Sequence, residues 1–138
     1  MPTEADIRFM KRAIELGREV SLERGQAGPF GCVVVKDGEV VAEGVNRVLS
    51  DGDPTAHGEM VALREACRAL GTHDLSGCVV YSSSEPCPMC YAACWWARVD
   101  AIRCASTVAI LSFSNKIDSP VANSSSSSTR STFISNFI

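Results

Sequence analysis

Two short motifs constrain this chain more than any other feature of its sequence. Residues 86–90 read Pro-Cys-Pro-Met-Cys, and residues 57–59 read His-Gly-Glu. Cys87 and Cys90 stand at the start of an expected helix, where both sulfurs can converge on one ion and where the helix N-terminus favours thiolates. His57 stands at the start of another expected helix and supplies a third ligand. The fold must therefore bring two helix starts together around one metal ion.

This ligand set predicts a zinc site of the catalytic type. Two thiolates and one imidazole give Zn²⁺ three protein ligands, and a tetrahedral ion then keeps its fourth position for water. The metal lowers the pKa of such a water to roughly 7. Glu59, two residues after His57, is expected to act as general base toward this water and then as general acid toward a leaving nitrogen.

Each motif taken alone has a simpler interpretation. A C-x-x-C motif can be a redox pair, and an isolated His-x-Glu can be a chance feature of a helix start. A structural zinc site needs a fourth ligand, for which Cys94 is the nearest candidate, but it lies about 6 Å further along the helix axis than Cys90. We expect Cys94 to pack in the core and His73 to be solvated. The other cysteines lie in apolar stretches and are also expected in the core: Cys32, Cys67, Cys78 and Cys104.

The pattern of apolar residues, glycines and prolines predicts a chain in which helices and strands alternate. Helices are expected over residues 4–24, 56–70 and 86–98. Strands are expected over residues 32–36, 39–46, 78–82 and 99–104. Thr3 is the expected N-cap of the first helix, with Asp6 three residues on, and Asp37-Gly38 is the expected two-residue hairpin turn. The order α-β-β-α-β-α-β suggests a mixed sheet with helices on both faces.

Charge and composition argue against several classes of protein. Thirteen Lys and Arg against sixteen Asp and Glu give a net charge of −3, which is unfavourable for nucleic-acid binding. No apolar run approaches the ~20 residues of a bilayer span, and no apolar stretch follows the acidic N-terminus as in a signal peptide. With seven cysteines and no secretory signal, we expect a cytoplasmic protein whose cysteines are thiols or metal ligands.

The segments around the two motifs resemble a known family. Asp-Pro-Thr-Ala-His-Gly-Glu at 53–59 and Ser-Glu-Pro-Cys-Pro-Met-Cys at 84–90 are similar to the cytidine and deoxycytidylate deaminase superfamily, whose nucleobase deaminases carry an H-x-E and P-C-x-x-C signature. The resemblance covers residues 4–105. It implies an α/β fold, a three-layer α/β/α cytidine-deaminase-like sandwich with a mixed central sheet, and Zn²⁺ as the cofactor.

Three further features are most similar to the small bacterial guanine deaminases and their nucleoside-deaminase relatives. They are Gly-Pro-Phe-Gly at 28–31, Asn46, and Trp-Ala-Arg at 96–98. In that branch the matching phenylalanine and asparagine contact the purine and the matching tryptophan lines the pocket, so the resemblance assigns Phe30, Asn46 and Trp96 to substrate binding. The alternatives are core packing for Phe30 and Trp96, and a turn at a strand end for Asn46.

The C-terminal part of the chain departs from this family. Residues 106–138 contain no glycine and include a run of serines over 124–128, which is typical of a flexible segment. Relatives continue here with helix and strand structure that completes the substrate pocket, partly across a dimer. We therefore expect a zinc-dependent deaminase domain over 1–105 and an atypical Ser-rich tail over 106–138. A smaller departure is Gly58, where the family usually has Ala or Val.

The resemblance implies a zinc-dependent hydrolase that deaminates a nucleobase, with guanine, converted to xanthine and ammonia, as the first candidate. The alternatives are a tRNA adenosine deaminase and a guanosine or cytidine deaminase. A non-catalytic zinc-stabilised protein with an incomplete pocket is the alternative from another class. The expected partners are a small purine base or nucleoside and a second copy of the chain in a homodimer, with neither nucleic acid nor a membrane.

Overall fold

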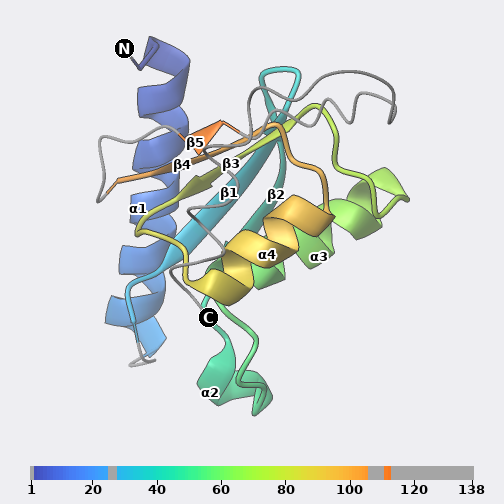
Figure 1. Ribbon diagram of the computed structural model, residues 1–138. Helices are drawn as coiled ribbons and strands as arrows, with labels where there is room; N and C mark the ends of the chain where they lie inside the picture. Colours follow the sequence, from blue (N-terminus) through green and yellow to red (C-terminus); the bar gives the residue numbers. More distant parts are fainter. Residues whose placement is uncertain (1, 25–27, 106–110, 113–138) are drawn as a thin grey trace, which may run out of the picture.

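The elements follow the expected order, with two short additions. The computed structural model describes residues 2–24, 28–105 and 111–112. Its elements are α1 (Glu4–Arg24), β1 (Gly31–Lys36), β2 (Glu39–Val45), α2 (Val48–Asp51), α3 (Gly58–Leu70), β3 (Cys78–Ser82), α4 (Pro88–Trp96), β4 (Ala101–Cys104) and β5 (Leu111–Ser112) (Figure 1).

The strands form one mixed sheet in the order β2-β1-β3-β4-β5. β1 is antiparallel to β2 and to β3, whereas β3 and β4 are parallel. The β1–β2 hairpin turns at Asp37 and Gly38, both with positive φ, as a type I′ turn requires. Parallel strands need a crossover connection, and α4 provides it between β3 and β4. The expected mixed sheet is therefore confirmed.

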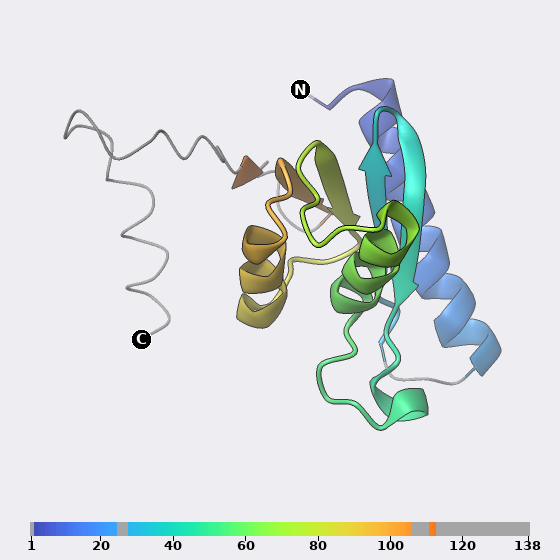
Figure 2. The ribbon, with the colours of Figure 1, turned by 90° about the vertical axis from the view of Figure 1, so that its right-hand side faces the viewer.

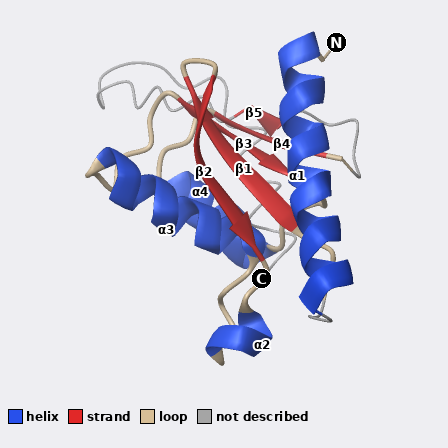
Figure 3. Cartoon of the chain, turned by 180° about the vertical axis from the view of Figure 1, so that it is seen from behind, coloured by secondary structure: helices blue, strands red, loops and turns tan. Residues whose placement is uncertain are grey.

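Helices cover both faces of this sheet, which makes the three-layer α/β/α architecture. α1 lies on one side of the strands, and α3 and α4 lie on the other (Figures 2 and 3). Alternate residues of β1 serve the two layers: Val33 and Val35 pack in the cluster with α1, and Cys32 and Val34 pack in the cluster with α3 and α4. Burial on both faces explains the unbroken apolar run of this strand.

A reciprocal cap starts α1, as expected. The backbone N–H of Asp6 donates to Thr3 Oγ1 (3.1 Å), and the backbone N–H of Thr3 donates to Asp6 Oδ2 (2.8 Å). The same carboxylate accepts a hydrogen bond from Tyr81 Oη of β3 (2.7 Å) and pairs with Arg103 of β4 (3.3 Å). Asp6 thus joins the helix cap to two strands of the sheet.

The boundaries of the two helices on the other face differ from the sequence expectation. α3 begins at Gly58 and α4 at Pro88, each two residues later than predicted, because His57 and Cys87 are N-caps with extended backbone. The short helix α2 was not predicted. β5 pairs with β4 through Leu111 and Ser112, and the rest of the segment 106–138, including the serine run, lies outside the described residues.

Candidate metal centre

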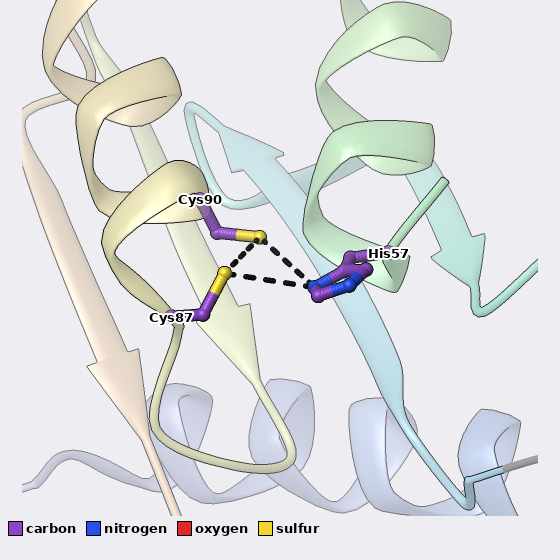
Figure 4. A group of neighbouring side chains, drawn as sticks. All are labelled: His57, Cys87 and Cys90. Carbon is purple, nitrogen blue, oxygen red and sulfur yellow. Dashed lines mark hydrogen bonds between the residues drawn. The ribbon is translucent and has the colours of Figure 1, made fainter. Parts of the chain in front are cut away.

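The N-termini of α3 and α4 meet on one side of the sheet and bring the three predicted ligands together. His57 is the N-cap of α3, Cys87 is the N-cap of α4, and Cys90 lies in the first turn of α4. His57 Nδ1 lies 3.6 Å from Cys87 Sγ and 3.7 Å from Cys90 Sγ, and the two sulfurs are 3.6 Å apart (Figure 4). All three side chains point toward a common centre.

These separations fit a tetrahedral zinc ion. Zn–S bonds of ~2.3 Å and Zn–N bonds of ~2.0 Å place neighbouring ligand atoms roughly 3.5–3.8 Å apart in a tetrahedron. The donor set, two thiols and one imidazole, is also one that zinc prefers. In the part of the chain that the structure describes, no other cluster of His, Cys, Asp and Glu has this geometry.

The surroundings of Cys90 differ from the expectation that its thiol ionises readily at a helix start. Burial, followed by the nearby carboxylate of Glu59, raises the pKa of the Cys90 thiol well above its ordinary value. Both causes disfavour a further negative charge at this place. A divalent cation reverses that balance, because a thiol that coordinates a metal is deprotonated.

Glu59 lies in the first turn of α3 with its carboxylate beside Cys90. The residue is 6% exposed. Its Oε1 accepts a hydrogen bond from Ser82 Oγ (2.7 Å), and its Oε2 lies 3.5 Å from Cys90 Sγ. One oxygen therefore faces the strand and the other faces the metal ligands. Glu59 is predicted by the sequence, whereas Ser82 is not. The sequence signal for Ser82 is a polar residue that continues the buried row of Cys78 and Val80 on β3.

Two of the three residues assigned to substrate contacts lie beside this group. The backbone N–H of Asn46 donates to the carbonyl of Phe30 (3.3 Å), and a Cβ at Gly58 would lie 3.3 Å from the same carbonyl. Phe30 and Asn46 therefore adjoin the helix start that carries His57 and Glu59. Phe30 is 41% exposed, so it does not pack in the core that the described residues form. Asn46 Oδ1 accepts a hydrogen bond from the backbone N–H of Val48 (3.0 Å). The side-chain carbonyl of Asn46 therefore closes the turn at the end of β2.

Trp96 lies apart from them. It is the last residue of α4, roughly 13 Å along the helix from Cys87 at ~1.5 Å per residue. It is 74% exposed and makes an edge-on contact with Trp95. Among the residues that the structure describes, the side chain of Trp96 neither packs in the core nor joins the ligand group.

The other cysteines and His73 lie where the sequence predicted. Cys94 is fully buried in the core between the sheet and α4, and burial raises the pKa of its thiol to about 12. His73 is exposed. The remaining cysteines are buried or half-buried: Cys32, Cys67, Cys78 and Cys104. The metal group therefore contains three protein ligands, with Cys94 outside it.

Comparison with known proteins identifies the family. The sequence model of the cytidine and deoxycytidylate deaminase zinc-binding region matches residues 3–112. The chain belongs to the cytidine and deoxycytidylate deaminase family. Zn²⁺ is accordingly its cofactor, and the described residues contain a His/Cys/Cys group suited to hold it.

Relatives in this family differ in their substrates. The chain is 51% identical to guanine deaminase of Bacillus subtilis over 94 residues, which are 68% of this chain and 60% of that protein. It is 40% identical to the tRNA-specific adenosine deaminase of Aquifex aeolicus over 94 residues, 68% of this chain and 61% of that protein. The X-ray structure of Bacillus subtilis guanine deaminase superimposes with a TM-score of 0.69 at 48% identity, covering 77% of this chain and 65% of that one. The chain thus spans less than two thirds of the length of each of these relatives.

No helix among the described residues combines the length and the apolar character needed to cross a membrane.

Proposed function

We propose that this protein is a cytoplasmic deaminase that converts guanine and water to xanthine and ammonia. The observation that carries the proposal is the buried carboxylate of Glu59, whose Oε2 lies 3.5 Å from Cys90 Sγ and therefore faces the metal ligands. A general base in that place can exchange protons with a water molecule that reacts beside the metal. The similarity to guanine deaminase of Bacillus subtilis supports the choice of substrate.

The ligands His57, Cys87 and Cys90 would hold Zn²⁺, which supplies Lewis-acid activation of water at neutral pH. Glu59 then takes one proton from the attacking water at Oε2. It returns that proton to the exocyclic nitrogen, which leaves as ammonia while the carbon keeps the oxygen. The carboxylate ends in its starting state, so one residue serves both proton transfers.

Phe30 and Asn46 are the proposed purine contacts. The backbone carbonyl of Phe30 lies beside the start of α3, and its exposed ring offers a face for stacking. Asn46 Oδ1 already accepts the hydrogen bond of the turn. The proposed contact of Asn46 with the base therefore uses its side-chain NH₂ as donor. Trp96 is exposed at the far end of α4. We propose that it lines the pocket of a second copy in a homodimer.

The charges favour a free base over tRNA as substrate. Arg47 pairs with Asp51 (3.1 Å), and Arg64 pairs with Asp53 (3.7 Å). Both arginines lie in the segment around His57, and each has an acidic neighbour, which weakens the positive field that a polynucleotide requires. The 40% identity to a tRNA-specific adenosine deaminase nevertheless makes that activity the second candidate.

Ammonia release tests the proposal when it is measured on protein whose zinc content is determined in the same sample. The substrates are guanine, guanosine, adenine, cytidine and the adenosine of a tRNA anticodon stem-loop. We expect one zinc per chain and turnover of guanine. Zinc with turnover of the stem-loop alone would favour the second candidate. Zinc without any turnover would favour a non-catalytic zinc protein.

The matched variant for this assay is Glu59→Gln, which keeps the shape of the side chain and removes its basicity. We expect Glu59→Gln to bind zinc as the native protein does and to lose at least ~10²-fold in kcat. Near-normal kcat in this variant would show that Glu59 is not the proton carrier.

A further inference from the structure

The hydroxyl of Ser82 is a polar group in an otherwise apolar row. Alternate residues of β3, Cys78, Val80 and Ser82, face the layer of α3 and α4, and the first two belong to its core cluster. Ser82 is 1% exposed. A buried hydroxyl needs a hydrogen-bond partner, because burying it without one carries a desolvation penalty. That partner is Glu59 Oε1, at 2.7 Å.

This hydrogen bond gives the two carboxylate oxygens of Glu59 different surroundings. Oε1 is held by Ser82 from the sheet side, and Oε2 lies 3.5 Å from Cys90 Sγ on the side of the metal ligands. The terminal torsion of a glutamate is broad and has no sharply preferred value. A fixed donor on one oxygen therefore decides the plane of the carboxylate and the direction of the other oxygen.

We propose that Ser82 is a positioning residue for the deamination reaction: its hydroxyl holds Oε1 so that Oε2 of Glu59 is the oxygen that exchanges protons. The inference rests on the proposed function, in which Glu59 carries the proton. Ser82 itself touches neither the metal ligands nor the substrate in this scheme, and it acts only through Glu59.

The expected consequence of removing the hydroxyl is a loss in kcat without loss of zinc. In Ser82→Ala the carboxylate can rotate away from the productive plane, and misplacement of a catalytic group by about 1 Å can cost up to ~10²-fold in rate. We expect kcat to fall about tenfold while KM and zinc content stay near those of the native protein.

The neighbouring Ser83 provides the matched control. Its Oγ accepts a hydrogen bond from the backbone N–H of Gly31 (3.0 Å), so Ser83→Ala also removes one hydroxyl and one hydrogen bond at the end of β3. It leaves Glu59 untouched, and we expect kcat close to the native value. An equal fall in kcat in both variants would overturn the proposal, since it would indicate general loosening of this strand end.

A double-mutant cycle separates positioning from structural damage. If Ser82 acts through the carboxylate, Ser82→Ala should lower kcat about tenfold in the native background and hardly at all in the Glu59→Gln background. A tenfold loss in both backgrounds would overturn the proposal, because the hydroxyl would then act independently of Glu59.

A readout without turnover keeps this inference separate from the proposed function. The ¹³C resonance of the Glu59 carboxyl, assigned by its disappearance in Glu59→Gln, should shift in zinc-loaded Ser82→Ala and stay unchanged in Ser83→Ala. An unchanged resonance in Ser82→Ala would overturn the positioning itself. If the resonance shifts but the native protein deaminates none of the substrates, the contact stands, whereas the proposed function and the kinetic role of Ser82 both fail.

Discussion

Cys90 and Cys94 are one helical turn apart on α4, yet they meet different surroundings. Cys90 lies in the first turn with its sulfur 3.7 Å from His57 Nδ1, whereas Cys94 is fully buried in the core. At ~1.5 Å of rise per residue, the four positions move the second sulfur about 6 Å along the helix. The rise of the helix thus decides which thiol is a ligand.

This difference leads to a prediction for a matched pair of alanine variants. Cys90→Ala removes a thiolate ligand, so zinc binding should weaken by orders of magnitude. Cys94→Ala removes only buried volume and should cost about 1 kcal/mol of unfolding free energy while one zinc per chain is retained. Zinc per chain, measured by atomic absorption after dialysis, checks both variants. Zinc loss in Cys94→Ala would mean that Cys94 is a ligand.

At the scale of elements, α3 is placed by a close approach to β2 at Gly44. A Cβ at Gly44 would lie 2.3 Å from the carbonyl oxygen of Gly58 and 2.4 Å from the backbone nitrogen of Ala62. Both atoms belong to the backbone of α3, so the helix itself would have to move. His57 and Glu59 flank Gly58, so the position of the metal site depends on the close approach that Gly44 allows.

Gly44→Ala should therefore weaken both the fold and zinc binding. Overpacking typically costs about 1–3 kcal/mol of unfolding free energy, and displacement of His57 should lower zinc affinity at least ~10-fold. Gly38→Ala is the control: it strains a turn with φ of +76° at a cost of about 1 kcal/mol, and its added Cβ meets no atom within 4 Å. Denaturant unfolding and chelator competition measure the two effects, and equal zinc affinity in both variants would contradict the argument.

The contact between α1 and the sheet depends on the charge of Asp6. Burial raises the pKa of this carboxyl, but hydrogen bonds from Tyr81 and Thr3 and the charge of Arg103 outweigh it, so the pKa is lowered from its ordinary value. A lowered pKa in the folded state means that the ionised form stabilises the fold above the unfolded pKa of ~3.9. This contribution is lost as the pH falls below that value.

Asp6→Asn should accordingly lower stability at neutral pH more than in acid. Hydrogen bonds to a charged group are worth about 1.5–3 kcal/mol, so the melting temperature of Asp6→Asn should lie clearly below that of the native protein at pH 7. The gap should narrow as the pH falls below ~4. Thermal unfolding followed at several pH values checks this, and a constant gap from pH 7 to pH 3 would show that the charge of Asp6 does not matter.

At the scale of the whole molecule, the metal ligands come from two helices that share one face of the sheet. His57 belongs to the start of α3, and both cysteines belong to the start of α4. Only the folded chain holds the three ligands together, so we expect zinc binding to stabilise the folded state relative to the unfolded chain.

Chelation should therefore lower the melting temperature by at least about 10 °C, the shift that a binding contribution of ~3–4 kcal/mol gives a domain of this size. Added zinc should restore it. The Cys90→Ala variant is the control, because its melting temperature should not respond to chelator. An unresponsive native protein would mean that zinc contributes nothing to the fold.

Features that depend on neighbours along the chain can be predicted from the sequence alone. The reciprocal cap of Thr3 and Asp6, the turn at Asp37 and Gly38, and the ligands at two helix starts all follow from spacings of a few residues. Backbone geometry converts such spacings directly into local structure. Both helices nevertheless begin two residues later than their sequence patterns predict, because His57 and Cys87 are N-caps with extended backbone.

Contacts between residues far apart in the chain do not follow from local spacing. Ser82 and Glu59 are 23 positions apart, and their contact depends on how α3 lies across the sheet. The approach of α3 at Gly44 and the exposure of Trp96 on α4 are likewise set by the packing of the layers. Periodicity along the chain predicts which face of a helix or strand a residue occupies. Strand register and helix placement determine which atom of another element lies opposite that residue.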